Sequence, residues 1–265
     1  MHRSPVEDLA HEHGIEVLTP YSCNDSGFVA RLKQLSPQCC PVVAYGKLLP
    51  KPVLEVPDHG WVNLHFSLLP AWRGAAPVHA AIRHGDDLTG ATTFLLDEGM
   101  DTGPVFGMVT EAISPADTSG SLLGRLSNVG AGLLVATLDA IANGTTHPLP
   151  QPADGVSYAP KISGGDARVN WTHPAMAVDR QIRACTPEPG AWTEFNGSRL
   201  SLGPVTIDTD AAALPAGHAA ITKAGVWVGT ATSSVRLGLV QAPGKKPTPA
   251  ADWARGLRVH ELVLQ

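Results

Sequence analysis

The amino-acid sequence predicts an α/β protein in which a mostly parallel sheet with flanking helices is followed by a small β-barrel. Up to about residue 145, short apolar runs alternate with helix-like segments, which is typical of a parallel sheet covered on both faces. Beyond Trp192, short alternating runs are separated by turn residues, which is typical of a small barrel. We therefore expect a first domain over 1–165, a linker over 166–191 and a barrel over 192–265.

Helix signals occur at four places in the first domain. Ser4, Pro5 and Glu7 form an N-cap, a first-turn proline and a capping-box glutamate, which predict a helix over 4–13. Apolar spacing and end signals predict the other three helices, at 28–35, 75–84 and 119–142.

Apolar runs between these helices predict the strands of the sheet, at 15–18, 41–44, 61–65, 90–96 and 104–111. In the barrel, Asn196-Gly197 predicts a two-residue hairpin turn. Further barrel strands are expected at 225–229, 235–240 and 259–265.

Composition excludes some classes of protein. The formal net charge of −5 argues against a generally basic nucleic-acid binder, although it leaves room for a local basic patch. No apolar run reaches the roughly 18–20 residues of a membrane span, and the best run, Leu133–Ala142, is interrupted by Asp139. The cysteines have neither C-x-x-C nor zinc spacing, so we expect reduced thiols, a cytoplasmic location and no metal; they are Cys23, Cys39, Cys40 and Cys185.

A polar pair ends the strand predicted at 61–65. Asn63 and His65 are two residues apart, so their side chains project from the same face of the strand. Ligand crevices of open α/β sheets lie at the carboxyl ends of strands. Asp101 follows the next strand, in a glycine-flanked segment, and is expected near the same edge.

These three residue types suit acyl transfer to an amine. A carboxylate on one imidazole nitrogen fixes the tautomer of His65 and raises its pKa. The other nitrogen and the Asn63 amide can then donate to a developing oxyanion. No G-x-S-x-G motif and no nearby cysteine supplies a nucleophile, so direct transfer between two bound substrates is expected. The alternative is a solvated strand end with a capping aspartate.

Seven segments together closely resemble the methionyl-tRNA formyltransferase family. They are Val42–Pro50, Asn63-x-His65, Ser67–Pro70, Trp72–Pro77, Asp101–Gly103, Thr193–Gly197 and Ala242–Lys246. The Asn-His-Asp set alone would identify only the wider superfamily that uses 10-formyltetrahydrofolate, whereas the Arg-Gly-Ala-Ala-Pro extension and the barrel favour the tRNA-specific member.

The resemblance implies a Rossmann-like formyltransferase domain, an OB-like barrel, and transfer of a formyl group from 10-formyltetrahydrofolate to methionyl-tRNA. Asn63 and His65 would stabilise the oxyanion, while Asp101 would hold His65 and help proton transfer. Three loops would bind the folate without metal, through Tyr45, Gly46, Lys47, Leu48, Leu49, Ser67, Leu68, Leu69, Pro70, Asp97, Glu98, Gly99 and Met100.

The expected partners are the folate and initiator methionyl-tRNA, bound by a monomer. Four cations are candidate tRNA contacts, namely Arg73, Arg183, Lys245 and Lys246. Each one alone could equally be a solvated surface charge.

The sequence also departs from the family it resembles. Family members begin with a strand–loop–helix–strand unit that has no counterpart here, so the first domain is expected to be incomplete at its N-terminus. Phe66 is bulkier than the glycine or alanine of many relatives. Two alternatives therefore stay open: a formyltransferase or hydrolase that uses the same folate with another acceptor, and an inactive tRNA-binding fragment.

Overall fold

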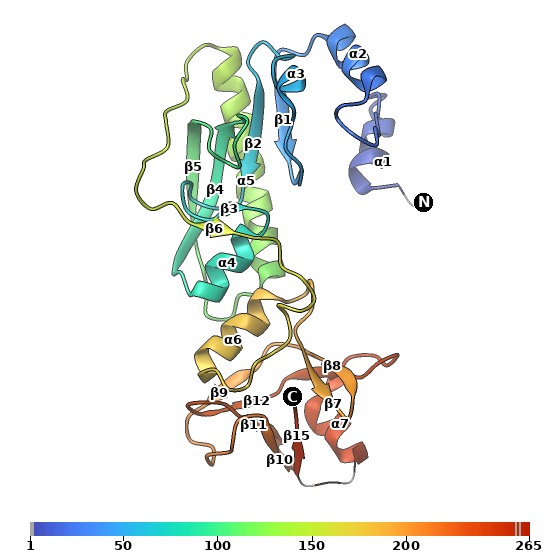
Figure 1. Cartoon of the computed structure of the whole chain (residues 1–265), viewed down its shortest axis with the longest axis vertical. Coiled ribbons are helices and arrows are strands. Elements are labelled where there is room, and N and C mark those ends of the chain that lie inside the picture. Colours follow the sequence, from blue (N-terminus) through green and yellow to red (C-terminus); the bar gives the residue numbers. More distant parts are fainter. Residues whose placement is uncertain (1–2, 258, 260) are drawn as a thin grey trace.

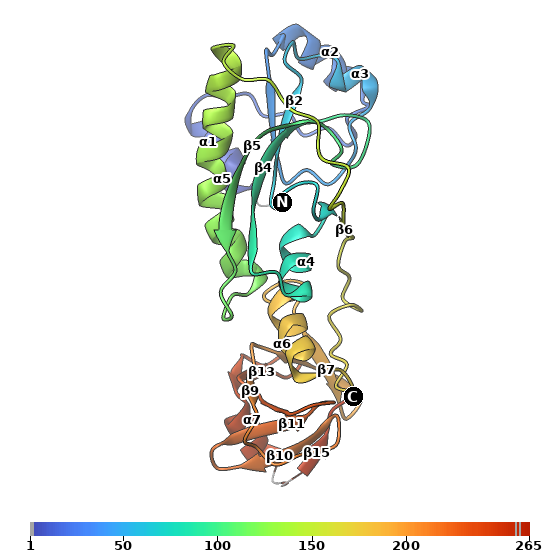
Figure 2. The same ribbon diagram turned by 90° about the vertical axis from the view of Figure 1, so that its left-hand side faces the viewer.

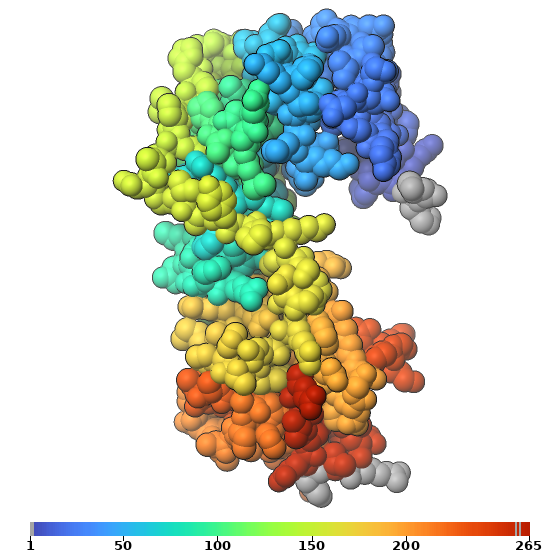
Figure 3. All heavy atoms as spheres, in the orientation of Figure 1, coloured from blue at the N-terminus to red at the C-terminus, as the bar shows by residue number. Residues whose placement is uncertain are grey.

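The structure is a computed structural model that describes residues 3–257, 259 and 261–265. Figure 1 shows an elongated molecule with a helix-covered sheet at one end and a β-rich part at the other. The space-filling view narrows between the two parts (Figure 3). The fold therefore has the two units that the sequence predicts.

The sheet of the first part has four strands in the order β1-β2-β4-β5. Strands β1 (Cys40–Val43) and β2 (Trp61–His65) are parallel, but β4 (Leu88–Leu95) is antiparallel to β2 and β5 (Val105–Ala112) is antiparallel to β4. The prediction of a mostly parallel sheet is therefore wrong. Parallel neighbours need a crossover, whereas a loop without a helix joins β4 to β5, and α4, between β2 and β4 in the chain, lies beside the end of β4 (Figure 1).

The helices agree better with the sequence. The four predicted helices are confirmed, and Ser4 accepts a hydrogen bond from the Glu7 N–H as an N-cap should. Their bounds are α1 (Pro5–Glu12), α2 (Ser26–Leu35), α4 (Pro77–His84) and α5 (Ser119–Ala142), and a short α3 (Lys51–Leu54) was not predicted. The predicted strand at 15–18 is wrong, because these residues have no regular structure and pair with no strand.

Helix α5 supports the sheet along its length (Figure 2). Its buried residues recur every three or four positions and form one stripe: Ser119, Leu122, Leu126, Gly130, Leu134, Thr137 and Ile141. By length and composition alone this helix could cross a membrane. In the structure α5 contacts β4 and β5, and Leu122 and Leu126 of the stripe pack against Val78 and Ile82 of α4.

The second part contains two sheets, with strand orders β15-β10-β11-β12-β9 and β14-β13-β8-β7. The strands are β7 (Trp192–Phe195), β8 (Ser198–Leu202), β9 (Thr206–Asp208), β10 (His218–Thr222), β11 (Gly225–Gly229), β12 (Ser234–Arg236), β13 (Leu239–Gln241), β14 (Thr248–Pro249) and β15 (Glu261–Val263). Helix α7 (Ala250–Leu257), which was not predicted, also belongs to this part. A two-stranded sheet of β3 (Arg73–Gly74) and β6 (Tyr158–Ala159) lies beside the first domain.

The hairpin at Asn196-Gly197 is confirmed, with φ of 50° and 71° at the two turn residues. The strand predicted at 235–240 is divided between β12 and β13. Glu194 and Gln265 exchange two backbone hydrogen bonds and join the two sheets at one side. The described residues do not form the closed OB-like barrel that was predicted.

The segment predicted as a linker contains helix α6 (Ala175–Ala184). Val178 and Ile182 of this helix are fully buried in the same apolar cluster as Val226 and Val228 of β11. The domain boundary stays a prediction, but this segment packs as part of the second core.

Candidate functional site

The polar pair at the end of β2 lies where two cavities meet. Asn63 and Asp101 line both a cavity of about 140 Å³ and a neighbouring one of about 430 Å³, while His65 lines the larger one. The His65 Nδ1 atom lies 3.8 Å from the Asp101 Oδ2 atom. The three residues singled out from the sequence are therefore brought together at one point.

The tautomer of His65 is set by the main chain. Its Nε2 atom lies 2.9 Å from the carbonyl oxygen of Trp72. Since a carbonyl can only accept, Nε2 carries the hydrogen, and Nδ1 of the neutral ring is left with a lone pair. Burial lowers the pKa of His65 below its ordinary value, against the opposing effects of the Asp101 charge and the Trp72 carbonyl. His65 is thus a neutral base at neutral pH.

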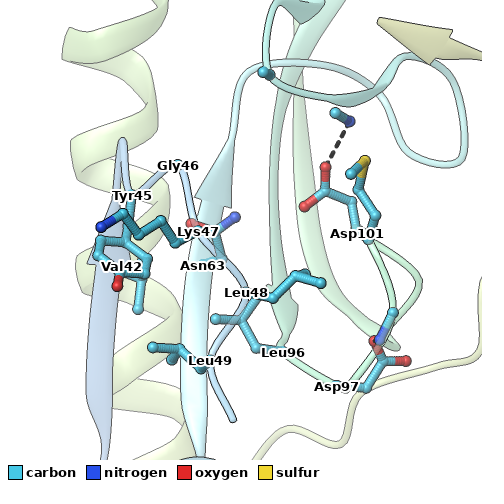
Figure 4. A pocket seen from close by; sticks show the side chains of 14 residues that line it. Val42, Tyr45, Gly46, Lys47, Leu48, Leu49, Asn63, Leu96, Asp97 and Asp101 are labelled. Carbon is cyan, nitrogen blue, oxygen red and sulfur yellow. Dashed lines mark hydrogen bonds between the residues drawn. The ribbon is translucent and has the colours of Figure 1, made fainter. Parts of the chain in front are cut away.

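Asp101 is held by the main chain on its other side. The Gly74 N–H donates to Asp101 Oδ2 at 2.7 Å, and this bond is the dashed line in Figure 4. The 3.8 Å separation from His65 is too long for a hydrogen bond. The expectation that Asp101 fixes the tautomer is therefore wrong, because the Trp72 carbonyl does so, and Asp101 acts on the ring through its charge.

The smaller cavity is mostly apolar (Figure 4). The predicted loop Tyr45–Leu49 lines it, as do Asp97, Gly99 and Met100, whereas Glu98 does not. The sequence reasoning missed its other lining residues, which are Val42, Gly74, Ala75 and Leu96. None of these four side chains carries a polar group, so their residue types did not indicate a binding site.

The loop Ser67–Pro70 lines neither cavity, contrary to expectation. Ser67 Oγ donates to the Ala71 carbonyl at 2.6 Å, and Thr92 Oγ1 donates to the Ser67 carbonyl at 2.6 Å. Leu69 is only 2% exposed. This loop is packed beneath the site and supports the turn that carries the Trp72 carbonyl.

Two family models match the chain: formyl transferase over residues 1–138, and the formyl transferase C-terminal domain over residues 161–258. The chain belongs to the formyl transferase family. Over 257 residues, or 97% of its length, this formyltransferase is 59% identical to a methionyl-tRNA formyltransferase of Salinispora arenicola, of which it covers 83%. It is 61% identical to the methionyl-tRNA formyltransferase of Thermobifida fusca, over 97% of this chain and 83% of that one.

Solved structures share the fold at much lower identity. HypX from Aquifex aeolicus superposes with a TM-score of 0.69 at 20% identity, over 93% of this chain and 44% of that one. An N-formyltransferase from Helicobacter canadensis superposes with a TM-score of 0.67 at 17% identity, over 89% of this chain and 82% of that one. These likenesses show that the fold is that of the formyltransferases.

The four candidate tRNA cations of this formyltransferase lie in different environments. Lys245 and Lys246 are exposed in a turn of the second part. Arg183 is only 8% exposed, and its guanidinium binds Asp179 and the Asp117 carbonyl. Arg183 therefore links the two parts of the molecule, and its guanidinium is not available to bind a phosphate. Arg73 is half-buried and donates to Gln151 at 2.6 and 3.1 Å.

Within the residues that the structure describes, no group of three His, Cys, Asp or Glu side chains could hold a metal ion. The four cysteines are free thiols, and burial raises the pKa of Cys40 to about 11.

Proposed function

We propose that this formyltransferase transfers the formyl group of 10-formyltetrahydrofolate to the α-amino group of methionyl-tRNA, which produces the initiator formylmethionyl-tRNA. The observation that carries this proposal is the position of Asn63, His65 and Asp101 at the junction of two cavities. Direct transfer needs this arrangement, because donor and acceptor must meet at one set of polar groups. Identity of about 60% to methionyl-tRNA formyltransferases over almost the whole chain supports the choice of substrates.

We assign the smaller cavity to the ring end of the folate. Val42, Leu48, Leu49 and Leu96 offer apolar surface to a flat ring. The Asp97 carboxylate already accepts hydrogen bonds from Gly99 N and Thr102 Oγ1, so it shapes the loop that closes this cavity. The exposed Lys47 lies at the cavity and suits the carboxylates of a folate tail.

The larger cavity fits the acceptor. Phe66, Val78 and Leu123 provide apolar walls, next to His65 and Asn63. A methionyl side chain placed against these walls would leave its α-amino group facing the polar trio. The bulk of Phe66 therefore narrows the acceptor side, not the folate side, since it lines only the larger of the two cavities.

We assign a distinct task to each polar group. The Asn63 amide donates to the oxyanion that forms when the amine attacks the formyl carbon. His65 is not the second oxyanion donor that the sequence predicted, because its Nε2–H donates to the Trp72 carbonyl. The lone pair of His65 Nδ1 instead accepts the proton that the amine gives up, and the Asp101 carboxylate 3.8 Å away stabilises the resulting imidazolium. The same proton then passes to the departing nitrogen of the folate, which returns His65 to its neutral form.

Substitution of the trio tests this proposal. Loss of one oxyanion donor costs roughly 10²–10³ in turnover, so Asn63→Ala should lower kcat by about that factor. Loss of a general base costs roughly 10²–10⁴, so His65→Ala should lower kcat by about that factor. Binding of methionyl-tRNA, measured by filter retention, should persist in both variants. His218→Ala removes an exposed histidine of β10 and serves as the control. Full activity of His65→Ala would overturn the assignment.

We also propose that Lys245 and Lys246 contact the tRNA backbone. Their exposed turn concentrates positive charge on a chain whose net charge is −5. Removal of a lysine that neutralises one phosphate lowers the salt slope of binding by about one. Lys245→Glu plus Lys246→Glu should therefore raise the KM for methionyl-tRNA and leave that for the folate unchanged. Lys33→Glu plus Lys223→Glu changes the net charge equally at other exposed lysines and should leave both constants unchanged.

The proposal includes a monomer that acts in the cytoplasm. Four free thiols fit a reducing compartment. Light scattering of the purified chain at working concentration tests the oligomeric state, and a mass near twice 27.7 kDa would contradict it.

A further inference from the structure

Gln151 lies in the irregular segment after α5 and makes four hydrogen bonds to the surroundings of the site. Its Oε1 atom accepts from Arg73 Nε at 3.1 Å and from Arg73 Nη2 at 2.6 Å. Its Nε2 atom donates to the carbonyl oxygens of Asp101 and Gly103, both at 2.8 Å. An arginine can only donate and a carbonyl can only accept, so this orientation of the amide is the only consistent one.

These bonds close a ring around Asp101. Gln151 holds the Asp101 carbonyl, Asp101 Oδ2 accepts from the Gly74 N–H, and Gly74 follows Arg73, which binds Gln151. Asp101 has a φ of 54°, a left-handed conformation that is uncommon for a residue other than glycine and that the hydrogen bonds of this ring stabilise. The ring fixes both the main chain and the carboxylate of Asp101.

We propose that Gln151 is a positioning residue for formyl transfer: it holds the Asp101 loop in its left-handed conformation and thereby fixes the distance from the Asp101 carboxylate to the His65 imidazole. This inference rests on the proposed roles of Asp101 and His65. Gln151 lines neither cavity, so it acts through the main chain that it holds at Asp101 and beside Gly74.

The molecule contains a matched control. Gln181 of α6 donates through its Nε2 atom to the carbonyls of Asp166 and Arg168, at 2.9 and 2.8 Å. Both glutamines thus bridge the carbonyls of residues two apart, but Gln181 does so in the second core, where it is 6% exposed. Equal substitutions at the two positions separate a catalytic effect from a structural one.

Gln151→Met keeps the length of the side chain and removes both donor and acceptor. A misplacement of about 1 Å can cost about 10² in rate, so kcat should fall about 10- to 100-fold while both KM values stay within about twofold. Gln181→Met should lower the thermal midpoint without changing kcat. Unchanged kcat in Gln151→Met would overturn the proposal.

A second variant, Gln151→Glu, distinguishes a loss of positioning from a failure to fold. A glutamate keeps the acceptor for Arg73 as a salt bridge, but it places an oxygen against two carbonyl oxygens. We expect a folded protein with a larger loss of kcat than Gln151→Met. A stable Gln151→Glu variant with full kcat would also overturn the proposal.

A third readout does not depend on activity. Titration of the His65 ring by NMR reports its distance from Asp101, the charged group that faces it. In Gln151→Met the carboxylate is released, so the midpoint should move to lower pH, and it should stay in place in Gln181→Met. If the wild-type chain formylated no tRNA, this titration would still test the positioning role, so the two proposals can fail separately.

Discussion

The catalytic region and the core of the second part hold their shapes by different means. Around the site, Ala44, Trp72 and Asp101 have φ between 54° and 59°, although none is a glycine. In the described residues of the second part, Asn196 is the one non-glycine residue with such a φ, and a hairpin turn favours it there. Ser36, with a φ of 44° at the end of α2, is the other such residue among the described residues of the first part. Three of the four left-handed non-glycine residues of that part therefore lie around the candidate site.

The apolar packing shows the opposite distribution. One large cluster extends through the second part, whereas the first part has three small ones. The site therefore depends on hydrogen bonds that hold strained backbone, and the second part depends on burial. Substitutions in the first region should therefore change the rate of the reaction, and those in the second region should change the stability of the fold.

The largest stability effect is expected in the second core. Ile182 is fully buried, so Ile182→Ala should lower the free energy of unfolding by about 2–5 kcal/mol. Urea denaturation measures this, and kcat of the folded fraction should be unchanged. Leu239→Ala removes a side chain that is 51% exposed and should change stability by less than about 0.5 kcal/mol. A large loss of kcat in the folded fraction of Ile182→Ala would contradict the expectation that substitutions in the second part change stability but not rate.

One glycine of each region allows the two regions to be compared by the same substitution. Gly74 has a φ of 120° and an added Cβ would lie 2.7 Å from the Ala159 carbonyl oxygen, while Gly217 has a φ of 76° and would meet the Leu264 carbonyl oxygen at 2.5 Å. Both alanine variants should lose about 1–3 kcal/mol of stability. Only Gly74→Ala, which displaces the N–H that holds Asp101, should also lower kcat, and equal kinetics in the two variants would contradict this.

Asp117, at the boundary between the regions, links stability to pH. It accepts hydrogen bonds from Ser114 N, Ser121 Oγ and both terminal nitrogens of Arg125. The Arg125 hydrogen bonds lower the pKa of Asp117 to about 2 from its ordinary value of 3.8. A lowered pKa stabilises the fold above the ordinary value, and this contribution is lost as the pH falls towards 2.

Asp117→Asn should therefore cost about 1–3 kcal/mol at pH 7. The difference between this variant and the wild type should close as the pH falls from about 4 to 2. Thermal unfolding at a series of pH values measures it, and a difference that stayed constant would show that the charge of Asp117 is not responsible.

The smallest expected effect is a change in the pKa of His65. Asp101 raises the pKa of His65 while burial lowers it, so Asp101→Asn should lower the His65 pKa further. Since buried neutral His65 binds a proton less readily than in the unfolded chain, it stabilises the fold at pH values above about 6.5 and this contribution falls in more acidic solution. NMR titration checks the first statement, and a rise of the midpoint in Asp101→Asn would contradict it.

Local signals in the sequence predicted local structure well. The bounds of β2 and α5 agree with the structure, because caps, apolar spacing and turn residues act over a few positions. Asn63, His65 and Asp101 were singled out because they have polar or titratable side chains at strand ends, and the structure places all three at the larger cavity. The direction of β4 was not predicted, since periodicity shows that a strand forms but not which way it runs.

The groups that hold the site residues in place could not be predicted from the sequence, for a different reason. The Trp72 carbonyl that sets the His65 tautomer is main chain, which every residue has. Gln151 is fifty positions from Asp101, and nothing in its neighbourhood marks it as a partner. Arg183 carries a charge that suggested tRNA, but its burial against Asp179 and Asp117 depends on how α6 packs.

The first turn of α5 gives the molecule a mechanical connection between its two ends. Ser119 Oγ and Gly120 N both donate to the Thr186 carbonyl of the second part. One turn further along, Leu123 and then Ser127 line the larger cavity. At 1.5 Å per residue the 24-residue helix is a rod about 36 Å long. A displacement of the second part would thus be transmitted through α5 to one wall of the larger cavity, and a change in hydrogen exchange at residues 123–127 on tRNA binding would detect it.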